Sequence, residues 1–424
     1  MAHLLLFDLP GGDDPGLFQT AIELGHEITF CTSDLSYYRN KGPEFFEDIT
    51  QANQIIDMPD MAYEPLCRQL DVIHAATPFD AVINVLDIRG VLAARVAKRY
   101  GLRYLCPDAA QLTRDKTRVR ARLQENGIPQ PAFAQVKTIE ELMTALNQTG
   151  YPAILKPSDG LGSDNVYYLT GPESITEDVI SLFQLSEGLA YGFGARSSQL
   201  YSVEPYMKGR LIGVDVFSDG RTRTMLGINA KKMCPPPSFA IAGSTYSSQQ
   251  FDDAVVREFA FSVLDAIGFD FGACHIEMIV HEEGVYVVEI NARLVNAQIP
   301  YQMSYALDRS VYADFIHLHL GMPLSEMPPF ARQAFSVIRW VVADRHGVLE
   351  EIGLPDMTHP QIERVVMFKG EGDTVQPPMS NQDRIGYVIV TAETEEEGVR
   401  LADEFVNATR LRIASCSAEP CQMA

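Results

Sequence analysis

Two kinds of apolar pattern take turns over residues 1–112: short continuous runs and residues at helical spacing. Short apolar runs at Leu4–Phe7, Ile28–Cys31 and Ala81–Val85 have the length of buried strands. Apolar residues at helical spacing separate these runs and occupy Phe18–Leu24, Tyr63–Ala75 and Leu92–Tyr100. Because strands that alternate with helices form a parallel sheet covered on both faces, the pattern predicts an N-terminal α/β domain.

The turn Pro10–Gly16 follows the first predicted strand, where a dinucleotide-binding fold has its phosphate loop. The turn lacks the Gly-x-Gly-x-x-Gly spacing, and Asp13 and Asp14 stand where a phosphate would bind. A plain strand-to-helix turn is therefore favoured over a nucleotide site here.

A second module, expected over residues 113–331, begins with a charged helix at Leu112–Asn126 that Gly127 ends. Strand-like apolar runs follow at Tyr151–Lys156, Val166–Leu169, Tyr201–Ala230, Cys274–Val280 and Val285–Ile290. A Pro-rich loop, Cys234–Ser248, and a helix, Asp252–Ile267, lie among these strands.

The last part of the chain, residues 332–424, holds short strand-like runs and a late helix at Thr394–Asn407. This composition fits a small α+β domain. The predicted fold class is therefore mixed, α/β and α+β, in three parts.

The amino-acid composition disfavours some classes of binding partner. The 424 residues include 34 Lys and Arg against 56 Asp and Glu, a net charge of −22, which disfavours nucleic acid and anionic membranes as partners. No apolar stretch approaches the roughly 18 residues of a membrane span. The opening Met1–Asp8 lacks the basic start of a signal peptide, so a cytoplasmic protein is expected. The seven scattered cysteines predict neither disulfides nor a zinc site.

A strand that ends in Lys156 leads directly into a loop containing Gly160, Gly162 and Ser163. Backbone N–H groups in such a loop can turn toward an anion while the lysine supplies positive charge. The spacing is not that of a Walker loop. By itself the segment is either a phosphate cradle or an ordinary surface turn.

Glu277 and Glu289 lie on neighbouring apolar runs joined by a short turn, so a hairpin can bring both carboxylates together. Adjacent carboxylates repel unless a cation lies between them, and their oxygens with that of Asn291 suit Mg²⁺. Arg293 adds a fork-shaped donor, and on an extended chain it would share the face of Asn291. The alternative is two edge-strand glutamates that face solvent.

His275 lies two residues before Glu277, so both side chains are expected on one face of the strand. The histidine is a candidate substrate contact or, alternatively, a packed strand residue. A third candidate segment is Asp115-Lys116, in a helix whose charged face is otherwise read as solvated.

Together these segments resemble the ATP-grasp superfamily, and within it the carboxylate–amine ligases such as the L-amino-acid ligases that make dipeptides. The matching motifs occur in the family's order and are Thr113-Arg114-Asp115-Lys116, Lys156-Pro157 with Gly160-x-Gly162-Ser163, Val203-Glu204-Pro205-Tyr206-Met207, and Glu289-Ile290-Asn291-Ala292-Arg293. The resemblance covers essentially the whole chain. It implies an ATP-grasp fold with an N-terminal parallel α/β domain, a mobile lid at about 132–200 and a C-terminal closing domain.

The resemblance also assigns residue roles. The residues that would contact ATP are Lys116, Lys156, Gly160, Gly162, Ser163, Glu204, Tyr206 and Met207, with Glu204 on the adenine amino group. The ligands of Mg²⁺, which Mn²⁺ could replace, would be Glu277, Glu289 and Asn291. The catalytic residues would be Arg293, Lys156 and His275.

The implied reaction joins a carboxylate to an amine through an acyl phosphate, with small molecules, amino acids among them, as substrates and ADP and phosphate as products. A homodimer is compatible with this reading. Two alternatives stay open: a purine-pathway ATP-grasp ligase acting on a phosphoribosyl substrate, and a non-catalytic nucleotide-binding protein.

Two departures from the family pattern affect these assignments. Leu211 stands where related ligases carry an acid for the ribose, so Asp215 or backbone groups would have to contact the ribose. After Arg293, the chain reads Leu294-Val295-Asn296-Ala297 where amino-acid ligases have a glycine pair. The identity of the substrates therefore stays open.

Overall fold

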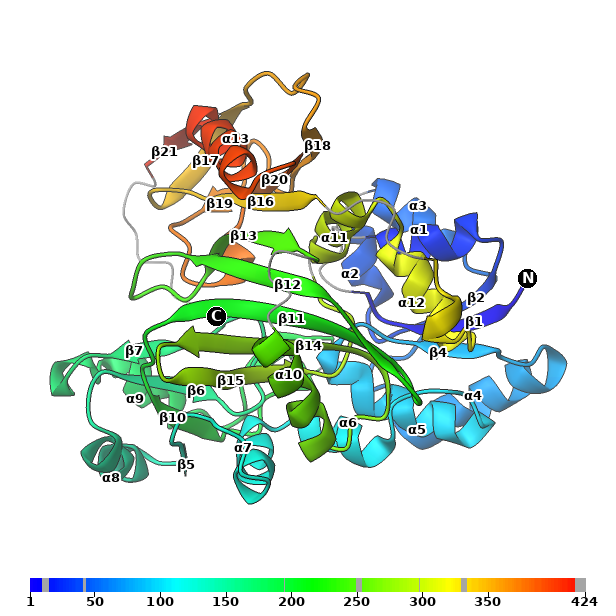
Figure 1. Cartoon of the computed structure of the whole chain (residues 1–424), viewed down its shortest axis with the longest axis horizontal. Helices are drawn as coiled ribbons and strands as arrows, with labels where there is room; N and C mark the ends of the chain where they lie inside the picture. The colour runs from blue at the N-terminus through cyan, green and yellow to red at the C-terminus, as the bar shows by residue number, and fades with distance from the viewer. Residues whose placement is uncertain are drawn as a thin grey trace.

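Figure 1 shows the computed structural model of the chain, which describes residues 1–9, 15–40, 43–193, 195–248, 254–296, 298–328 and 334–415. Predictions for most of the Pro10–Gly16 turn, Gly194, Ala297, the domain boundary at 331/332, Cys416 and Cys421 lie outside these residues. The N-terminal sheet lies on the right of the view and the C-terminal strands at the top, around a long central sheet. The region predicted as a lid lies at lower left; it is taken as residues 132–205, so that it includes β10 (Tyr201–Pro205), and is called the lid below.

The N-terminal sheet is parallel, as predicted, with strand order β3-β2-β1-β4. Its strands are β1 (His3–Phe7), β2 (Glu27–Thr32), β3 (Gln54–Asp57) and β4 (Ala81–Ile83). Leu4 and Leu6 of β1 pack in one apolar cluster and Leu5 and Phe7 in another, because successive side chains point to opposite faces. The sheet is therefore buried on both sides.

Helices cover both faces of this sheet. Its main helices are α1 (Gly16–Glu23), α4 (Tyr63–Ala76) and α5 (Gly90–Tyr100), close to the predicted ranges. The sequence pattern did not predict β3 or the short helices α2 (Leu35–Asn40) and α3 (Pro43–Thr50). A single 3-10 turn, η1 (Asp87–Arg89), connects β4 to α5.

The prediction of one charged helix over Leu112–Asn126 is wrong at its start, because two separate helices meet there. Helix α6 (Pro107–Thr113) ends, and α7 (Lys116–Glu125) begins after Asp115. The Asp115 carboxylate accepts hydrogen bonds from the N–H groups of Thr117 and Arg118 and so caps α7. This cap places Lys116 at the first helical position.

The lid contains an antiparallel sheet in the order β5-β10-β6-β7. Its strands are β5 (Ala134–Val136), β6 (Ala153–Pro157), β7 (Tyr167–Leu169) and β10 (Tyr201–Pro205). Helices α8 (Ile139–Thr149) and α9 (Glu177–Leu182) share an apolar core with this sheet. A small hairpin of β8 (Ala190–Gly192) and β9 (Ala195–Arg196) follows α9.

The central sheet has eight antiparallel strands in the order β15-β14-β11-β12-β13-β16-β20-β18. They are β11 (Arg210–Asp219), β12 (Arg223–Met233), β13 (Ile241–Ser247), β14 (Phe271–His281), β15 (Gly284–Asn291), β16 (Phe335–Val341), β18 (Ile362–Met367) and β20 (Gly386–Ala392). The segment Cys234–Ser248 was predicted as a loop, but most of its second half is strand β13, whose short polar residues pair between β12 and β16. The sheet therefore continues into the C-terminal part of the chain.

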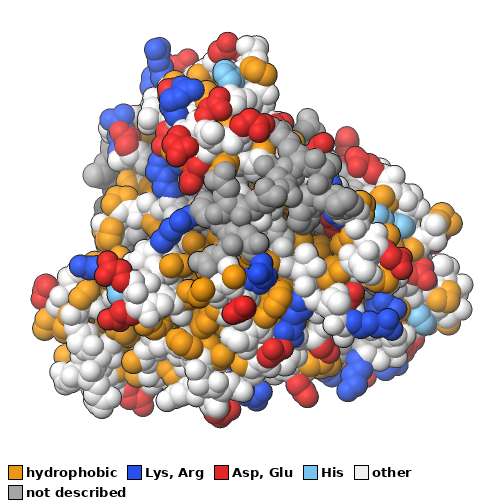
Figure 2. Space-filling view, viewed as in Figure 1, with side chains coloured by type: hydrophobic (Ala, Val, Ile, Leu, Met, Phe, Trp, Pro, Cys, Tyr) orange, Lys and Arg blue, Asp and Glu red, His pale blue; other side chains and the backbone are white. Residues whose placement is uncertain are grey.

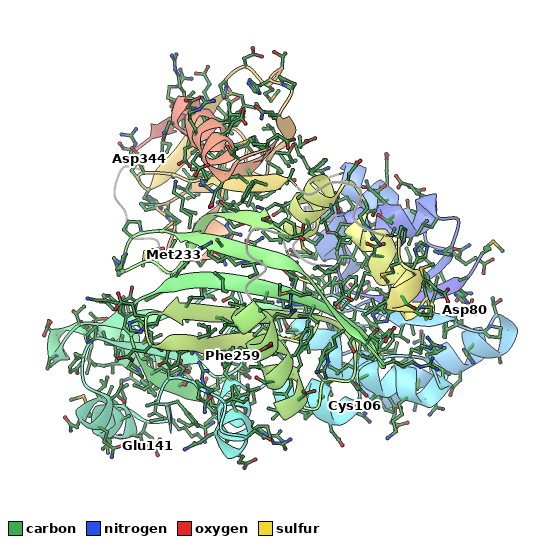
Figure 3. The ribbon with its side chains drawn as sticks, in the orientation of Figure 1. Asp80, Cys106, Glu141, Met233, Phe259 and Asp344 are labelled. Carbon is green, nitrogen blue, oxygen red and sulfur yellow. The ribbon has the colours of Figure 1, made fainter. Side chains whose placement is uncertain are left out.

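The helices that pack on the central sheet are α10 (Ala254–Ala266), α11 (Ile299–Leu307), α12 (Val311–His319) and α13 (Glu395–Ala408). Figure 3 places Phe259 on α10 beside this sheet and Glu141 at the outer end of the lid. A separate sheet joins β17 (Gly347–Gly353), β19 (Thr374–Val375) and β21 (Arg410–Ala414).

Charged side chains of both signs lie on the surface. On the face shown in Figure 2, acidic and basic side chains are scattered among apolar ones. In the part of the chain that the structure describes, no helix is both long enough and apolar enough to span a bilayer.

Candidate active site

The hairpin of β14 and β15 forms as predicted. Glu277 pairs directly with Glu289 across the two strands, and His275 pairs with Asn291. Because cross-strand partners point to the same face of a sheet, these polar side chains gather on one face of the central sheet. The Nε2 atom of His275 lies 3.7 Å from Oε1 of Glu277.

The carboxylate pair has the donor chemistry for a divalent ion. Two like charges directly opposite in a sheet are destabilising by themselves. Oxygens of Glu277, Glu289 and Asn291 fit Mg²⁺, which completes its shell with water and phosphate oxygens. Among the described residues, no three His, Cys, Asp or Glu side chains form a metal cluster.

Positive charges already surround the pair. Burial by itself raises the pKa of Glu277, but the hydrogen bond with His275 and the charges of Lys231 and Arg293 together lower it well below its usual range. The Nζ of Lys116 lies 3.1 Å from Oε1 of Glu289. Glu277 is therefore held in the ionised form that a metal ligand needs.

Lys116 also fixes the glycine-rich loop. Its Nζ donates a hydrogen bond to the carbonyl of Gly160 at 2.8 Å, and its backbone N–H donates to the carbonyl of Ser158 at 2.9 Å. Gly162 and Ser163 follow with φ values of 62° and 60°. The cap at Asp115 thus brings the predicted Lys116 to both the loop and the carboxylate pair.

Lys156 and Glu204 form a buried ion pair, with Lys156 Nζ 2.9 Å from Glu204 Oε2. Arg120 donates two further hydrogen bonds to Glu204, at 3.2 and 3.0 Å, and Ser202 donates a fourth at 3.1 Å. The pKa of Glu204 is raised by burial but lowered more strongly by these cations, to about 2. A carboxylate has about four acceptor positions, so an adenine amino group would have to displace one of these donors.

Arg120 was read as part of a solvated helix face, and that reading is wrong. Only 2% of its surface is exposed, and its guanidinium also donates to the carbonyls of Val287 and Val288. The side chain therefore ties α7 and the lid to β15. No local pattern in the charged helix distinguishes Arg120 from its exposed neighbour Arg118.

His275 has a second partner in Asp215, whose Oδ1 lies 2.8 Å from Nδ1 of the histidine. Asp215 was considered for the ribose, but it is 3% exposed and directed to His275. A Cβ at Gly213 would lie 2.3 Å from Cε1 of His275 and 3.3 Å from Cε of Lys231. The glycine therefore lets both side chains approach Glu277, which pairs with Gly213 across the strands.

Lys231 is a site residue that the sequence analysis did not single out. It lies on β12, and burial lowers its pKa while Glu277 and Asp215 partly offset that effect. It forms no hydrogen bond or ion pair with any described residue. The only sequence signal was a Lys-Lys pair inside an apolar strand.

Arg293 does not lie on an extended chain, so that premise was wrong. Strand β15 ends at Asn291, and the N–H of Arg293 donates to the Asn291 carbonyl at 2.8 Å, which turns the chain. Its guanidinium binds Asp87 of η1 at 2.7 and 2.8 Å. A small pocket beside this ion pair is lined by Asn84 and Arg114, among others.

The expected adenine hinge lies at the end of β10. The N–H of Tyr206 donates to the carbonyl of Pro152, and its ring contacts Tyr168 with centroids 4.9 Å apart. Met207 follows directly, and Leu211 lies further along on β11 opposite Ile279. Leu211 cannot supply the acidic group that contacts the ribose in related ligases, and none of the described contacts places another acid at this position.

Two protein families match parts of this chain. Residues 113–297 match the ATP-grasp domain family, and residues 339–414 match the family described as L-amino acid ligase C-terminal domain 2. The chain therefore contains an ATP-grasp domain. The predicted mixed fold class is confirmed.

Sequence relatives are distant and longer. An uncharacterized protein, y4rH, of Sinorhizobium fredii is 26% identical over 320 residues, which are 72% of this chain and 64% of that protein. The carbamoyl phosphate synthase large chain of Thermomicrobium roseum is 28% identical over 190 residues, 44% of this chain and 16% of its own length. This chain thus spans less than two thirds of the length of either relative.

Two solved structures share the fold over nearly the whole chain. The L-amino acid ligase of Bacillus licheniformis is 17% identical, with a TM-score of 0.79 and coverage of 98% of this chain and 99% of that one. The phosphoribosylglycinamide synthetase of Anaerococcus prevotii is also 17% identical, with a TM-score of 0.69 and coverage of 97% and 100%. At these identities the likeness establishes the fold alone.

Proposed function

We propose that this protein is an ATP-dependent carboxylate–amine ligase that forms an amide or dipeptide bond and releases ADP and phosphate. The observation that carries the proposal is the convergence of Glu277, Glu289 and Lys116 beside the Gly160 loop. Paired carboxylates next to a lysine and a glycine-rich loop are suited to hold a metal–nucleotide phosphate group.

Phosphate binding would fall to the loop and its lysines. Lys116 would leave the Gly160 carbonyl or Glu289 to contact a phosphate oxygen, and Lys156 would act beside Glu204. Mg²⁺ held by Glu277, Glu289 and Asn291 would neutralise phosphate charge. The flexible lysine side chains allow this exchange of partners without a change of fold.

The acyl phosphate would form beside His275, Lys231 and Arg293. Lys231 has no described ion-pair partner and lies near Glu277, so it is suited to contact the phosphoryl group in transfer. Arg293, anchored by Asp87, would contact the carboxylate or the developing oxyanion. His275, held by Asp215, would contact the substrate beside them.

Amino acids are the proposed substrates. The support is the match of residues 339–414 to an L-amino acid ligase domain, together with the fold likeness to the Bacillus licheniformis ligase. Because the fold also resembles that of phosphoribosylglycinamide synthetase, a phosphoribosyl amine is the alternative substrate that the experiment must exclude.

The test is a screen for ADP release over pairs of amino acids with ATP and Mg²⁺, with mass spectrometry of the products. The proposal expects a new amide in amounts equal to the ADP released by the wild type and no amide with Glu289→Ala. ADP release only with a phosphoribosyl amine would replace amino acids by the purine-type substrate. Nucleotide binding without any turnover over the complete screen would contradict the proposal.

A further inference from the structure

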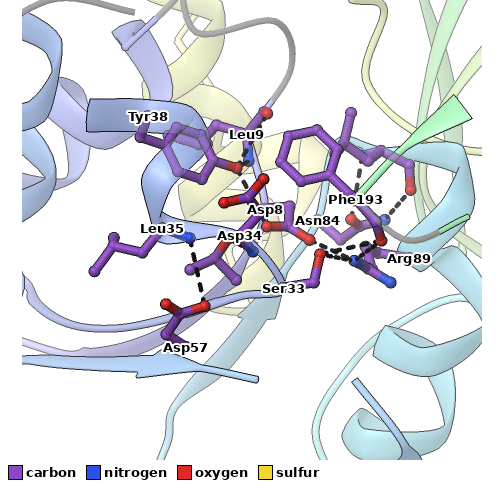
Figure 4. A network of polar contacts seen from close by, with 12 residues as sticks. Asp8, Leu9, Ser33, Asp34, Leu35, Tyr38, Asp57, Asn84, Arg89 and Phe193 are labelled. Carbon is purple, nitrogen blue, oxygen red and sulfur yellow. Dashed lines mark hydrogen bonds and ion pairs between the residues drawn. The ribbon is translucent and has the colours of Figure 1, made fainter. Parts of the chain in front are cut away.

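The β8–β9 hairpin of the lid reaches the carboxyl edge of the N-terminal sheet, although the two are far apart in sequence (Figure 4). Phe193 lies between the two hairpin strands. Its carbonyl accepts a hydrogen bond from Nη2 of Arg89 at 2.9 Å and another from Oγ of Ser33 at 3.1 Å. The lid thus touches the N-terminal domain through a defined set of donors.

The N-terminal domain holds these donors in place without the hairpin. Arg89 Nε donates to Asp8 at 2.7 Å, and Arg89 Nη2 donates to Ser33 Oγ at 2.6 Å. Tyr38 donates to the second oxygen of Asp8 at 3.2 Å and accepts from the N–H of Leu9. Asp8, Ser33, Tyr38 and Arg89 are all buried. The receiving surface is therefore preorganised.

The Phe193 side chain adds an apolar contact to these hydrogen bonds. Its ring lies 4.8 Å from that of Tyr37 and 5.9 Å from that of Tyr38, centroid to centroid. Its φ of 49° is in the left-handed region, which is strained for a bulky residue. Such a conformation persists only where contacts hold it, so the docked state of the hairpin is held by specific contacts.

The same short turn that binds the hairpin also binds the reaction centre. Arg89 is the last residue of η1, and Asp87 is the first. Oδ2 of Asp87 accepts a hydrogen bond from Nε of Arg293 and lies 2.7 Å from its Nη2. One 3-10 turn therefore links the tip of the lid to the arginine that follows the metal motif.

We propose that Phe193 latches the lid onto the N-terminal domain, and that Arg89 is a positioning residue that couples this docking to Arg293 through η1. The inference rests on the proposed ligase function. With the latch docked, bulk water is kept from the acyl phosphate. With the latch undocked, water attacks the acyl phosphate and returns the carboxylate and free phosphate, so ATP is consumed without amide formation.

The test compares Phe193→Ala with Leu185→Ala, a control in the lid whose side chain is 38% exposed. The measured quantity is the ratio of ADP to amide at saturating substrates. The latch predicts a ratio near one for the wild type and the control, and a ratio several-fold higher for Phe193→Ala. Ser33→Ala, which removes one donor to the Phe193 carbonyl, should raise the ratio by a smaller factor. An unchanged ratio in Phe193→Ala overturns the proposal.

A second measurement separates failure of the latch from failure of the ligase assignment. Hydrogen exchange of residues 188–198 is followed in the intact proteins with no substrate present. Faster exchange in Phe193→Ala than in Leu185→Ala supports docking, whatever the wild type catalyses. Equal exchange in the two variants overturns the latch even if the wild type is an active ligase.

Discussion

Glu204 and Glu277 are two ionised glutamates in the same chain, and they differ in how completely their carboxylates are hydrogen-bonded. Glu204 receives four hydrogen bonds from Arg120, Lys156 and Ser202, which satisfy both oxygens. Glu277 faces Glu289 and His275 and has Lys231 nearby without a described ion pair. Complete pairing stabilises a fold, whereas charges that lack partners are groups that a substrate or ion can still bind.

The difference predicts opposite responses to mutation. Removing a member of the Glu204 cluster should cost stability, because a buried charge would lose its partner. Removing a carboxylate of the Glu277 cluster should cost activity and less stability, because it breaks fewer interactions among the described residues, such as the partly exposed pair of Lys116 and Glu289. The variants below test this contrast in order of expected effect.

Glu289→Ala should show the largest effect. Losing a metal ligand is expected to lower ligation on the order of 1,000-fold, because phosphoryl transfer depends on the ion that neutralises the phosphates. The Glu289 side chain is 28% exposed, so thermal unfolding should change little. Steady-state ADP release and a melting curve measure both quantities. Turnover within a few-fold of the wild type would remove Glu289 from the metal site.

Arg120→Met should cost about 3 kcal/mol of unfolding free energy, since it leaves Glu204 partly unpaired inside the protein. Arg118→Met, on the exposed side of the same helix, is the matched control and should be nearly neutral. Denaturant unfolding of both variants provides the comparison. Equal stabilities would mean that the Glu204 cluster is not structural.

The same cluster predicts a pH dependence. The pKa of Glu204 is lowered from 4.5 to about 2 in the folded protein, so its ionised form stabilises the fold above pH 4.5. This stabilisation should be lost as pH falls from 4.5 toward 2. Unfolding of the wild type and Glu204→Gln over this range should converge at the acidic end. A difference that stays constant with pH would contradict the assignment.

Lys231→Met should lower ligation by about 100-fold, the size of one lost contact to transition-state charge. It should leave stability equal or slightly higher, because the lysine loses hydration on burial without a described ion-pair partner. Lys232→Met is the control, because Lys232 pairs with Asp403 at the surface. A loss of stability as large as that of Arg120→Met would place Lys231 with the structural charges.

Arg293→Lys should have the smallest of these effects, a rate loss of more than about tenfold with nearly unchanged nucleotide affinity. Lysine cannot reproduce the two-pronged contact with Asp87. Single-turnover rates and calorimetry separate chemistry from binding. If ATP affinity collapses while chemistry at saturating ATP is normal, Arg293 is a nucleotide anchor.

Local features of the fold were predictable, and contacts between distant segments were not. The β14–β15 hairpin and the shared face of His275 and Glu277 follow from strand periodicity and a short turn. The Asp115 cap was missed because the charged pattern runs through the junction of two helices. The contact between Asp87 and Arg293 joins residues 206 positions apart, so no local pattern could reveal it.

The burial of Arg120 illustrates the same limit. Val119 and Leu123 mark the buried face of its helix at an i, i+4 spacing, but this apolar pattern does not show that the charged Arg120 beside them is buried as well. The residue is buried because Glu204 and the carbonyls of Val287 and Val288 satisfy its donors. Those partners come from the lid and from β15, and only the folded chain assembles them.

An acyl phosphate is the central intermediate of the proposed reaction. A carboxylate substrate labelled with ¹⁸O on both oxygens, incubated with ATP, Mg²⁺ and the amine, tests this step directly. The account predicts that each phosphate released carries one ¹⁸O atom, because a substrate oxygen attacks the γ-phosphate and leaves with it when the amine displaces it. Amide formation with unlabelled phosphate would contradict the account.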